Sequence, residues 1–248
     1  SYTAGTIAKA YRTVTTPEAL GHLAARLRAA GHFALRVITD RPAAMRGAIV
    51  GLAFSTAARD ADYVPIARAR ARPDLGFLAD AHDQDHVSLP LHEVLAALGP
   101  ILADETIKKS GHDLKFDVIV LARHGIDVRG LQTDTMLASF LIDASRSEHR
   151  LEDLALEHTS YKALTEEDVC GKGVKAISIG DLPVDALLDF ACERADLAGQ
   201  LVPIVRTLLG IHQVEDLYER FELPLIPVLV AIERAGVRID GPALQAQS

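Results

Sequence analysis

The sequence lacks tryptophan and is poor in cysteine, methionine and aromatic residues, the last making up 5% of its 248 positions. Cys170 and Cys192 allow at most one disulfide, and nothing in their placement suggests a secreted disulfide scaffold. Neither the cysteines nor the ten histidines show the spacing of metal ligands. The core must therefore be built from Ala, Leu, Val and Ile, for which 49% apolar residues are ample.

Long apolar runs and a signal peptide are also missing, so we expect no membrane span and a cytoplasmic location. The net charge of -8 argues against a surface that is basic throughout, although a local basic patch remains compatible with it. The chain begins at Ser1 rather than Met, and we expect a monomeric piece of a longer protein.

Strand patterns dominate early and helical patterns late, with alternation between them. Thr16-Pro17-Glu18 combines a hydroxyl cap, a proline and an acid at a helix start, and predicts a helix to Gly31. Gly51 indicates a bulge or a close approach. The expected strands are 32–39, 47–56, 62–67 and one near 126–130, and 106–111 is expected to be a short strand or a loop. The other expected helices are 88–98 capped by Ser88, 114–125 closed by Gly125, 133–143, 150–159 and 182–209. This order indicates an α/β domain with a mixed sheet.

A domain boundary is expected between about 209 and 222. The stretch LLGIHQVEDLYERFELPLIPVLVAIERAG is long, amphipathic and helical, and VRID after it has the pattern of a new strand. We therefore predict one domain at 1–209, and a connecting helix with the start of another domain at 210–248.

Arg36 lies in the middle of FALRVITD, an otherwise apolar strand pattern (33–40). One reading is a surface arginine whose stem covers apolar neighbours. The apolar context favours the other reading, in which Arg36 forms an ion pair.

Several motifs resemble those of bacterial DNA polymerase I, the family A polymerases. ELPLIPVLVAIERAGVRID (222–240) is similar to the entrance of the polymerase domain, and GHDLKFDVIVLARHGIDVRGLQTDTMLASFLID (111–143) to the second exonuclease motif and the helix after it. HRLEDLA (149–155) and DFACERADLAGQL (189–201) resemble the following segment and the third motif. The polymerase-entrance pattern is matched by Glu222, Pro224, Leu225, Val228, Leu229, Glu233, Gly236, Val237, Ile239 and Asp240.

The resemblance covers about residues 10–240 and implies a ribonuclease H-like 3′–5′ exonuclease fold. Such a fold has a mixed five- or six-stranded sheet flanked by helices, followed here by the first helix of a polymerase domain. The resemblance also implies a site in which four carboxylates hold two divalent metals and a tyrosine orients the attacking water.

This sequence departs from that site at four of five positions. Arg36 and Ile38 stand where the first motif has Asp and Glu, and Phe190 and Arg194 stand where the third has Tyr and Asp, while Asp117 keeps the acid of the second motif. At ~4 Å two like unit charges cost on the order of 4 kcal/mol at a dielectric of 20, and a dication doubles this. We therefore expect no metal at these positions and a guanidinium paired with Asp117. The alternative interpretation is that Asp117 is a residual acid that only caps or pairs with groups near it in the chain.

Three acids lie near these positions in the sequence, and none is expected to point at the site as a replacement ligand. Asp40 shares the strand face of Arg36 but lies ~13 Å further along. Glu193 and Asp196 lie about 100° and 200° around the helix from Arg194.

Arginines alternate in ARARAR (67–72), which places Arg68, Arg70 and Arg72 on one face of an extended segment. Protection of a sheet edge is the commoner role of such a stripe, and phosphate contact is the alternative. Lys115, Lys108 and Lys109 form a second loose basic cluster. As for the arginine stripe, a solvated surface is the commoner role and phosphate contact is the alternative.

Together these features predict a catalytically silent exonuclease-like domain that supports a polymerase domain in DNA synthesis and contacts DNA. No cofactor is expected here, and Mg²⁺ is expected only at the polymerase site, outside these residues. Two alternatives stay open: an active proofreading nuclease with a rebuilt metal site, and a stand-alone nucleic-acid-binding module of the ribonuclease D type.

Overall fold

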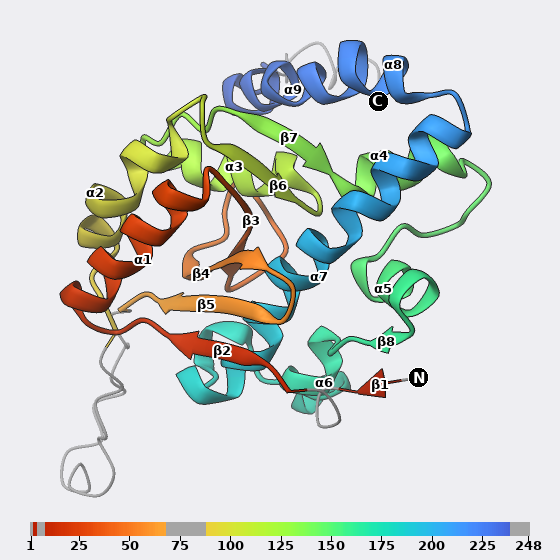
Figure 1. The fold of residues 1–248 in the computed structure, drawn as a ribbon. Coiled ribbons are helices and arrows are strands. Elements are labelled where there is room, and N and C mark those ends of the chain that lie inside the picture. The colour runs from red at the N-terminus through yellow and green to blue at the C-terminus, as the bar shows by residue number, and fades with distance from the viewer. Residues whose placement is uncertain (1, 4–7, 68–87, 239–248) are drawn as a thin grey trace, which may run out of the picture.

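The computed structural model describes residues 2–3, 8–67 and 88–238. Its centre is a six-stranded mixed sheet in the order β2-β5-β4-β3-β6-β7, with helices on both faces (Figure 1). β3 and β5 run antiparallel to β4, and the other pairs are parallel. The strands are β2 (Ala10–Thr13), β3 (His32–Thr39), β4 (Ile49–Ala57), β5 (Asp60–Pro65), β6 (Lys108–Gly111) and β7 (Leu131–Asp134), and β1 (Tyr2–Thr3) pairs separately with β8 (Tyr161–Lys162). The expected mixed α/β sheet is confirmed.

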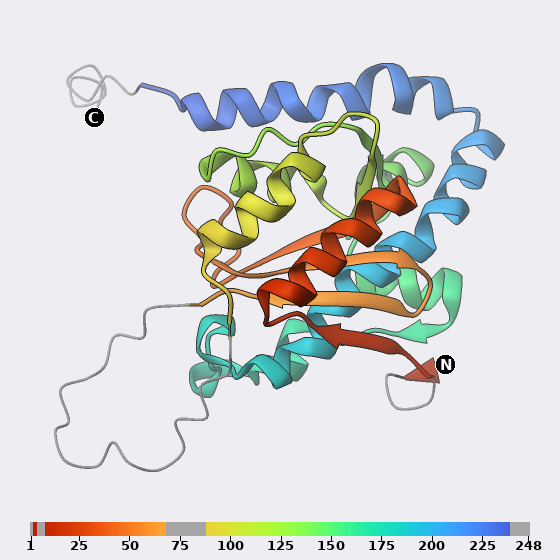
Figure 2. The same ribbon diagram turned by 60° about the vertical axis from the view of Figure 1, so that its left-hand side comes forward.

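Helices form a layer on each side of the sheet (Figure 2). α1 (Pro17–Ala30), α2 (Leu91–Leu102) and α3 (Leu114–Arg123) contribute to the core on one face, and the long α7 (Val184–Ile211) packs on the other. The remaining helices are α4 (Thr135–Ile142), α5 (Leu151–Thr159), α6 (Glu166–Cys170), α8 (Glu215–Leu217), the π-helix η3 (Tyr218–Glu222) and α9 (Leu223–Ala235), with 3₁₀ turns η1 (Gly173–Lys175) and η2 (Ile179–Asp181).

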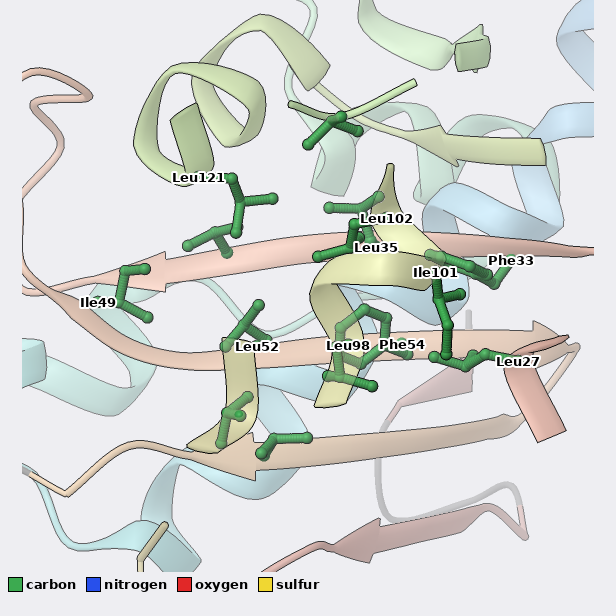
Figure 3. Packing of buried hydrophobic residues seen from close by; sticks show 14 of the residues in the cluster. Leu27, Phe33, Leu35, Ile49, Leu52, Phe54, Leu98, Ile101, Leu102 and Leu121 are labelled. Atoms are coloured by element: carbon green, nitrogen blue, oxygen red, sulfur yellow. The ribbon is translucent and has the colours of Figure 1, made fainter. Parts of the chain in front are cut away.

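The alternation of β3 decides which side chains reach the site. Phe33 and Leu35 point into the core formed with α1 and α2, where the Phe33 ring meets the edge of Phe54 at 5.7 Å (Figure 3). Ile38, of the opposite parity, packs in the cluster with α7. Because residues two apart share a strand face, Arg36 also points toward α7.

The first helix forms as predicted. The Thr16 hydroxyl accepts a hydrogen bond from the amide of Ala19 at 3.1 Å, and Gly31 ends the helix with φ +69°. Both ends are set by local chemistry, since a hydroxyl cap and a left-handed glycine satisfy orphan backbone groups.

Gly51 is a site of close approach, as predicted. A Cβ placed on it would lie 2.3 Å from the ring of Tyr63 on the neighbouring strand β5. Only glycine lets the tyrosine ring cross the strand there.

The predicted start of the second helix at Ser88 is wrong. α2 begins at Leu91 with Pro90 as its N-cap, and it continues past Pro100 to Leu102. A residue that precedes proline is disfavoured in the helical region, so Leu89 stays extended and bridges Ile66 instead.

The strand expected near 126–130 is displaced to β7. Gly130 has φ +72°, and a Cβ there would lie 2.5 Å from the carbonyl oxygen of Ile107. The strand therefore starts only after Gly130, where the two backbone segments lie in close contact. Asp134, the last residue of β7, is the N-cap of α4, and its side chain accepts hydrogen bonds from the amides of Met136 and Leu137.

The C-terminal helices fold back onto the same body. Tyr218 is fully buried, and Ile226 and Val230 of α9 join the core cluster that contains α1 to α3. No strand forms at Val237–Arg238, and the rest of the predicted strand lies outside the described residues. The domain division at 209/210 stays a prediction.

In the described ranges, no helix combines the length and apolar character needed to cross a membrane. Cys170 and Cys192 are both buried free thiols.

Candidate functional site

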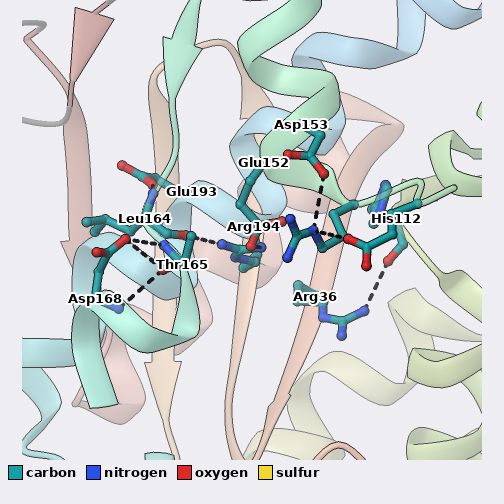
Figure 4. Close-up of polar contacts among 11 residues, drawn as sticks. Arg36, His112, Glu152, Asp153, Leu164, Thr165, Asp168, Glu193 and Arg194 are labelled. Carbon is teal, nitrogen blue, oxygen red and sulfur yellow. Dashed lines mark hydrogen bonds and ion pairs between the residues drawn. The ribbon is translucent and has the colours of Figure 1, made fainter. Parts of the chain in front are cut away.

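A cleft opens between β3, the start of α3, α5 and α7. Its first part is a pocket of about 280 Å³ whose walls include Arg36, Phe116, Phe190 and Arg194. Figure 4 shows Arg36 and Arg194 together with Glu152 and His112. The structure therefore brings together residues from three segments that are far apart in sequence.

Arg36 occupies the middle of this cleft. Its Nη1 lies 3.5 Å from Oδ1 of Asp117 and donates a hydrogen bond to the carbonyl oxygen of His112 at 3.0 Å. The guanidinium also lies 4.9 Å from the ring centroid of Phe116, within the range of a cation–π contact. The Arg36 side chain is 23% exposed and lies against a buried acid. These contacts agree with the hypothesis that Arg36 forms an ion pair, and not with the hypothesis of a surface arginine.

Asp117 lies beneath Arg36 and is fully buried. Its Oδ1 accepts from the amide of Val37 at 3.0 Å, while Oδ2 has no hydrogen-bond partner among the described residues. Burial raises the pKa of Asp117 to about 7, against the opposing effects of the Arg36 charge and the Val37 amide. A carboxyl in this state is poorly stabilised as an anion.

Arg194 occupies the α7 side of the cleft. Nη1 lies 2.7 Å from Oε1 of Glu152, Nη2 donates to the Leu164 carbonyl oxygen, and the guanidinium lies 4.6 Å from the Phe190 ring centroid. Phe190 is buried and shares a cluster with Ile38. An apolar contact therefore fills two positions where the resemblance implied a water-orienting tyrosine and a glutamate.

The three nearby acids are held elsewhere. Glu193 is fully buried, and its Oε1 forms an ion pair with Nζ of Lys9 at 2.8 Å. Its Oε2 accepts a hydrogen bond from the Leu164 amide. Two further acids have their own partners: Asp196 accepts from Tyr11 Oη at 2.7 Å, and Asp40 accepts from the Ala48 amide at 2.8 Å and pairs with Arg41.

Sequence reasoning missed the other acids of the cleft. Asp113, Glu152 and Glu166 line the pocket, and burial raises the pKa of Asp113. Glu152 lies in HRLEDLA (149–155), which resembles a segment of the family but contains none of the predicted site residues. Its pairing with Arg194 bridges 42 positions, which no local pattern reveals.

The predicted basic contacts have separate outcomes. Arg68, Arg70 and Arg72 lie outside the described residues. Lys115 forms an ion pair with Glu233 of α9. Lys109 does not belong to a surface cluster, because it is fully buried and its ammonium donates to the Asp104 carbonyl oxygen.

The residues present do not fit the two-metal centre implied by the resemblance. Across the described ranges, no group of three or more His, Cys, Asp or Glu side chains is placed to hold a metal ion. Two guanidiniums take the ligand positions, and the buried Oδ2 of Asp117 is orphaned. Hard divalent cations need several oxygen ligands, and this arrangement supplies cations where those ligands belong.

Residues 75–201 match the family model described as DNA polymerase I, ribonuclease H-like domain. The chain is 30% identical over 250 residues to DNA polymerase I of Rhizobium leguminosarum, covering 96% of this chain and 24% of that protein. It is 32% identical over 208 residues to DNA polymerase I of Pseudomonas aeruginosa, covering 83% and 22%. The chain thus spans about a quarter of the length of these relatives.

Solved structures share the fold. The POL domain of Pol1 from M. smegmatis, in complex with DNA primer-template and dNTP, aligns with a TM-score of 0.66 at 23% identity, covering 92% of this chain and 33% of that one. Brucella melitensis NrnC aligns with a TM-score of 0.62 at 17% identity, covering 83% and 86%.

Proposed function

Because the chain belongs to the family of the ribonuclease H-like domain of DNA polymerase I, we propose that it is a 3′–5′ exonuclease-like domain that has lost metal-dependent hydrolysis. Its remaining role is to support the polymerase portion of a longer DNA polymerase and to offer that enzyme a DNA-contacting surface. The observation that carries the proposal is the pair of guanidiniums, Arg36 and Arg194, in the cleft.

Charge argues against hydrolysis by the usual route. Two-metal cleavage needs cations that bind the attacking and leaving oxygens, and carboxylates that hold those cations. Arg36 already provides the positive charge beside Asp117, and Arg194 is neutralised by Glu152. A dication placed there would meet a guanidinium at the cost of several kcal/mol, about 8 kcal/mol at ~4 Å and a dielectric of 20.

The supporting role rests on the outer face of α9. One face of this helix packs on the core through Ile226 and Val230. The opposite side of α9, together with Phe221 of the preceding π-helix η3, carries large apolar side chains that are 43–60% exposed and follow one another at spacings of four, three and four residues: Phe221, Leu225, Val228 and Ile232. A helix that is apolar on two sides is typical of one buried between two bodies.

The polymerase portion of such an enzyme is the partner that this apolar stripe fits. The DNA polymerase I of Rhizobium leguminosarum, about four times as long, matches 96% of this chain, so a larger body is available to cover the stripe. In a longer chain that includes the polymerase portion, amide hydrogen exchange in residues 223–235 should be slower than in the 248-residue chain. Equal exchange in both would contradict the supporting role.

A nuclease assay tests the loss of hydrolysis. A 5′-labelled single-stranded oligonucleotide is incubated with the chain in Mg²⁺ and, separately, in Mn²⁺, next to Asp117→Asn and a metal-free control. We expect no metal-dependent shortening of the strand. Shortening that Asp117→Asn abolishes would instead establish the proofreading nuclease with a rebuilt site.

A further inference from the structure

The N-terminal segment, residues 8–13, contains the edge strand β2 and contacts the long helix α7. The Lys9 side chain is only 9% exposed, and its Nζ forms an ion pair at 2.8 Å with Oε1 of Glu193, whose side chain is fully buried. The ammonium also lies 4.9 Å from the ring centroid of Tyr11 and 5.3 Å from that of Tyr161. The pair is therefore shielded from water, and removal of its cation leaves a carboxylate in a costly environment.

Glu193 connects Lys9 to the segment that precedes α6. Its Oε2 accepts a hydrogen bond from the Leu164 amide at 2.7 Å, while the Leu164 carbonyl oxygen accepts one from Nη2 of Arg194 (Figure 4). Two neighbouring residues of α7 thus hold both backbone groups of Leu164. The next residue, Thr165, is the N-cap of α6. The start of α6 is therefore fixed to α7 through Leu164.

α6 and Arg194 both form walls of the 280 Å³ pocket of the cleft. Glu166, the first residue of α6, lines this pocket together with Arg194. Arg194 also lies 2.7 Å from Glu152 of α5, so it bridges two walls. α6 has five residues, and a helix of that length is not stable without tertiary contacts. Loss of the contacts at Leu164 should therefore loosen the α6 wall.

The N-terminal segment is the part of this network that detaches at the lowest free energy. β2 has four residues and pairs with β5 alone among the described strands. Terminal and edge elements open locally more readily than central ones. α7, in contrast, contributes Leu187, Phe190 and Ala195 to a buried cluster.

We propose that residues 8–13 act as a latch on the cleft, with Lys9 as a positioning residue. While the latch is docked on α7, Lys9 holds Glu193, and Glu193 holds Leu164 and the start of α6. When the latch detaches, the unpaired Glu193 releases Leu164, and the α6 wall opens. This inference does not rest on the proposed function, because it concerns the α6 wall whether or not the cleft hydrolyses DNA.

The two native thiols provide a site-specific test in the whole 248-residue chain. Cys170 is the last residue of α6 and Cys192 lies in α7, and both are buried and free. Labelling with iodoacetamide at pH 8 in native buffer, followed by mass spectrometry of peptides, measures the two rates separately. A local opening of α6 exposes Cys170 alone, whereas global unfolding exposes both thiols.

The test variants are Lys9→Met and Lys9→Met/Glu193→Leu, of which the second leaves no buried charge. Lys9→Arg is a conservative control, because a guanidinium keeps the charge and also stacks on tyrosine rings. Lys162→Met is a matched control that removes an exposed lysine from the neighbouring strand β8. Thermal unfolding shows whether each variant is folded.

We expect Cys170 to react at least about tenfold faster in both test variants, with the rate of Cys192 unchanged. Both controls should label like the wild type. The proposal is overturned by an unchanged Cys170 rate in the test variants, or by the same acceleration in either control. Equal acceleration at both cysteines, as in a variant that fails to fold, also overturns it, because Lys9 then supports the whole fold rather than the α6 wall.

Discussion

The guanidinium of Arg36 on β3 faces the buried carboxyl group of Asp117 on α3, with Nη1 3.5 Å from Oδ1. The charged contact between β3 and α3 is thus made by a guanidinium, at a place where the family resemblance implied a metal ion. The pair joins a position where the resemblance implied a metal ligand to the one acid of that implied set that this sequence keeps, and its energetics can be measured.

Removing the cation alone should destabilise the fold. At pH 8, above the pKa of about 7 at which Asp117 ionises in the folded protein, Arg36→Ala leaves a buried carboxylate without its opposite charge, and we expect the free energy of unfolding to fall by about 2–4 kcal/mol. Arg36→Ala/Asp117→Asn should recover at least half of that loss, because no buried anion then remains. Urea unfolding of the wild type, both single variants and the double variant measures the coupling; a double variant no more stable than Arg36→Ala would contradict the pairing.

The pH dependence of stability should report on Asp117. Burial raises its pKa in the folded state from 3.8 to about 7, so the folded protein favours the protonated form. Ionisation therefore opposes folding, and this group's contribution to stability is lost as pH rises from about 4 to 7. The stability of Asp117→Asn relative to wild type should increase by about 2 kcal/mol between pH 5 and pH 8.

The control for this pH series is Asp127→Asn, because Asp127 is an exposed acid. Its stability difference from the wild type should be small and the same at both pH values. A difference for Asp117→Asn that is constant with pH, or that shrinks at pH 8, would show that Asp117 is not held as described.

Tyr218 should fasten the C-terminal helices to the sheet. Its hydroxyl accepts a hydrogen bond from the Asp134 amide at 2.6 Å in a fully buried setting. Tyr218→Phe leaves that amide unpaired and should lower the free energy of unfolding by about 1–3 kcal/mol. Phe221→Tyr, which adds a hydroxyl at an exposed neighbouring position, should have little effect in the same chemical unfolding experiment.

Two glycine substitutions should have opposite effects. Gly51→Ala forces a Cβ to within 2.3 Å of the Tyr63 ring and should destabilise the protein by about 1–3 kcal/mol. Gly21→Ala lies in the interior of α1 with no atom near its new Cβ, and should stabilise by about 0.5–1 kcal/mol. Melting temperatures that move in the same direction for both would contradict the close approach at Gly51.

Elements governed by nearby residues could be predicted from the sequence. The cap at Thr16 and the left-handed Gly31 are both local, and α1 formed between them. The start of α2 was misplaced because the restriction that Pro90 imposes on the residue before it outweighed the capping preference of Ser88. The order of strand and helix patterns predicted a mixed α/β sheet, whereas the ribonuclease H-like fold with five or six strands followed from the motif resemblance.

Contacts between distant segments could not be predicted in this way. The pairing of Lys9 with Glu193 spans 184 positions, and that of Arg194 with Glu152 spans 42. Lys109 resembled a surface lysine, yet the parity of β6 directs it inward, where desolvation lowers its pKa to about 8. Such outcomes depend on which strand and helix faces meet, which a single sequence does not state.

Titration of Mn²⁺, followed by electron paramagnetic resonance of the free ion, tests most directly whether the cleft has lost its metals. The reference is Arg36→Asp/Ile38→Glu/Arg194→Asp, which restores three carboxylates beside Asp117. We predict no Mn²⁺ bound to the cleft of the wild type up to about 1 mM, and binding by the restored variant. Two Mn²⁺ ions bound by the wild type, and lost in Asp117→Asn, would contradict the account.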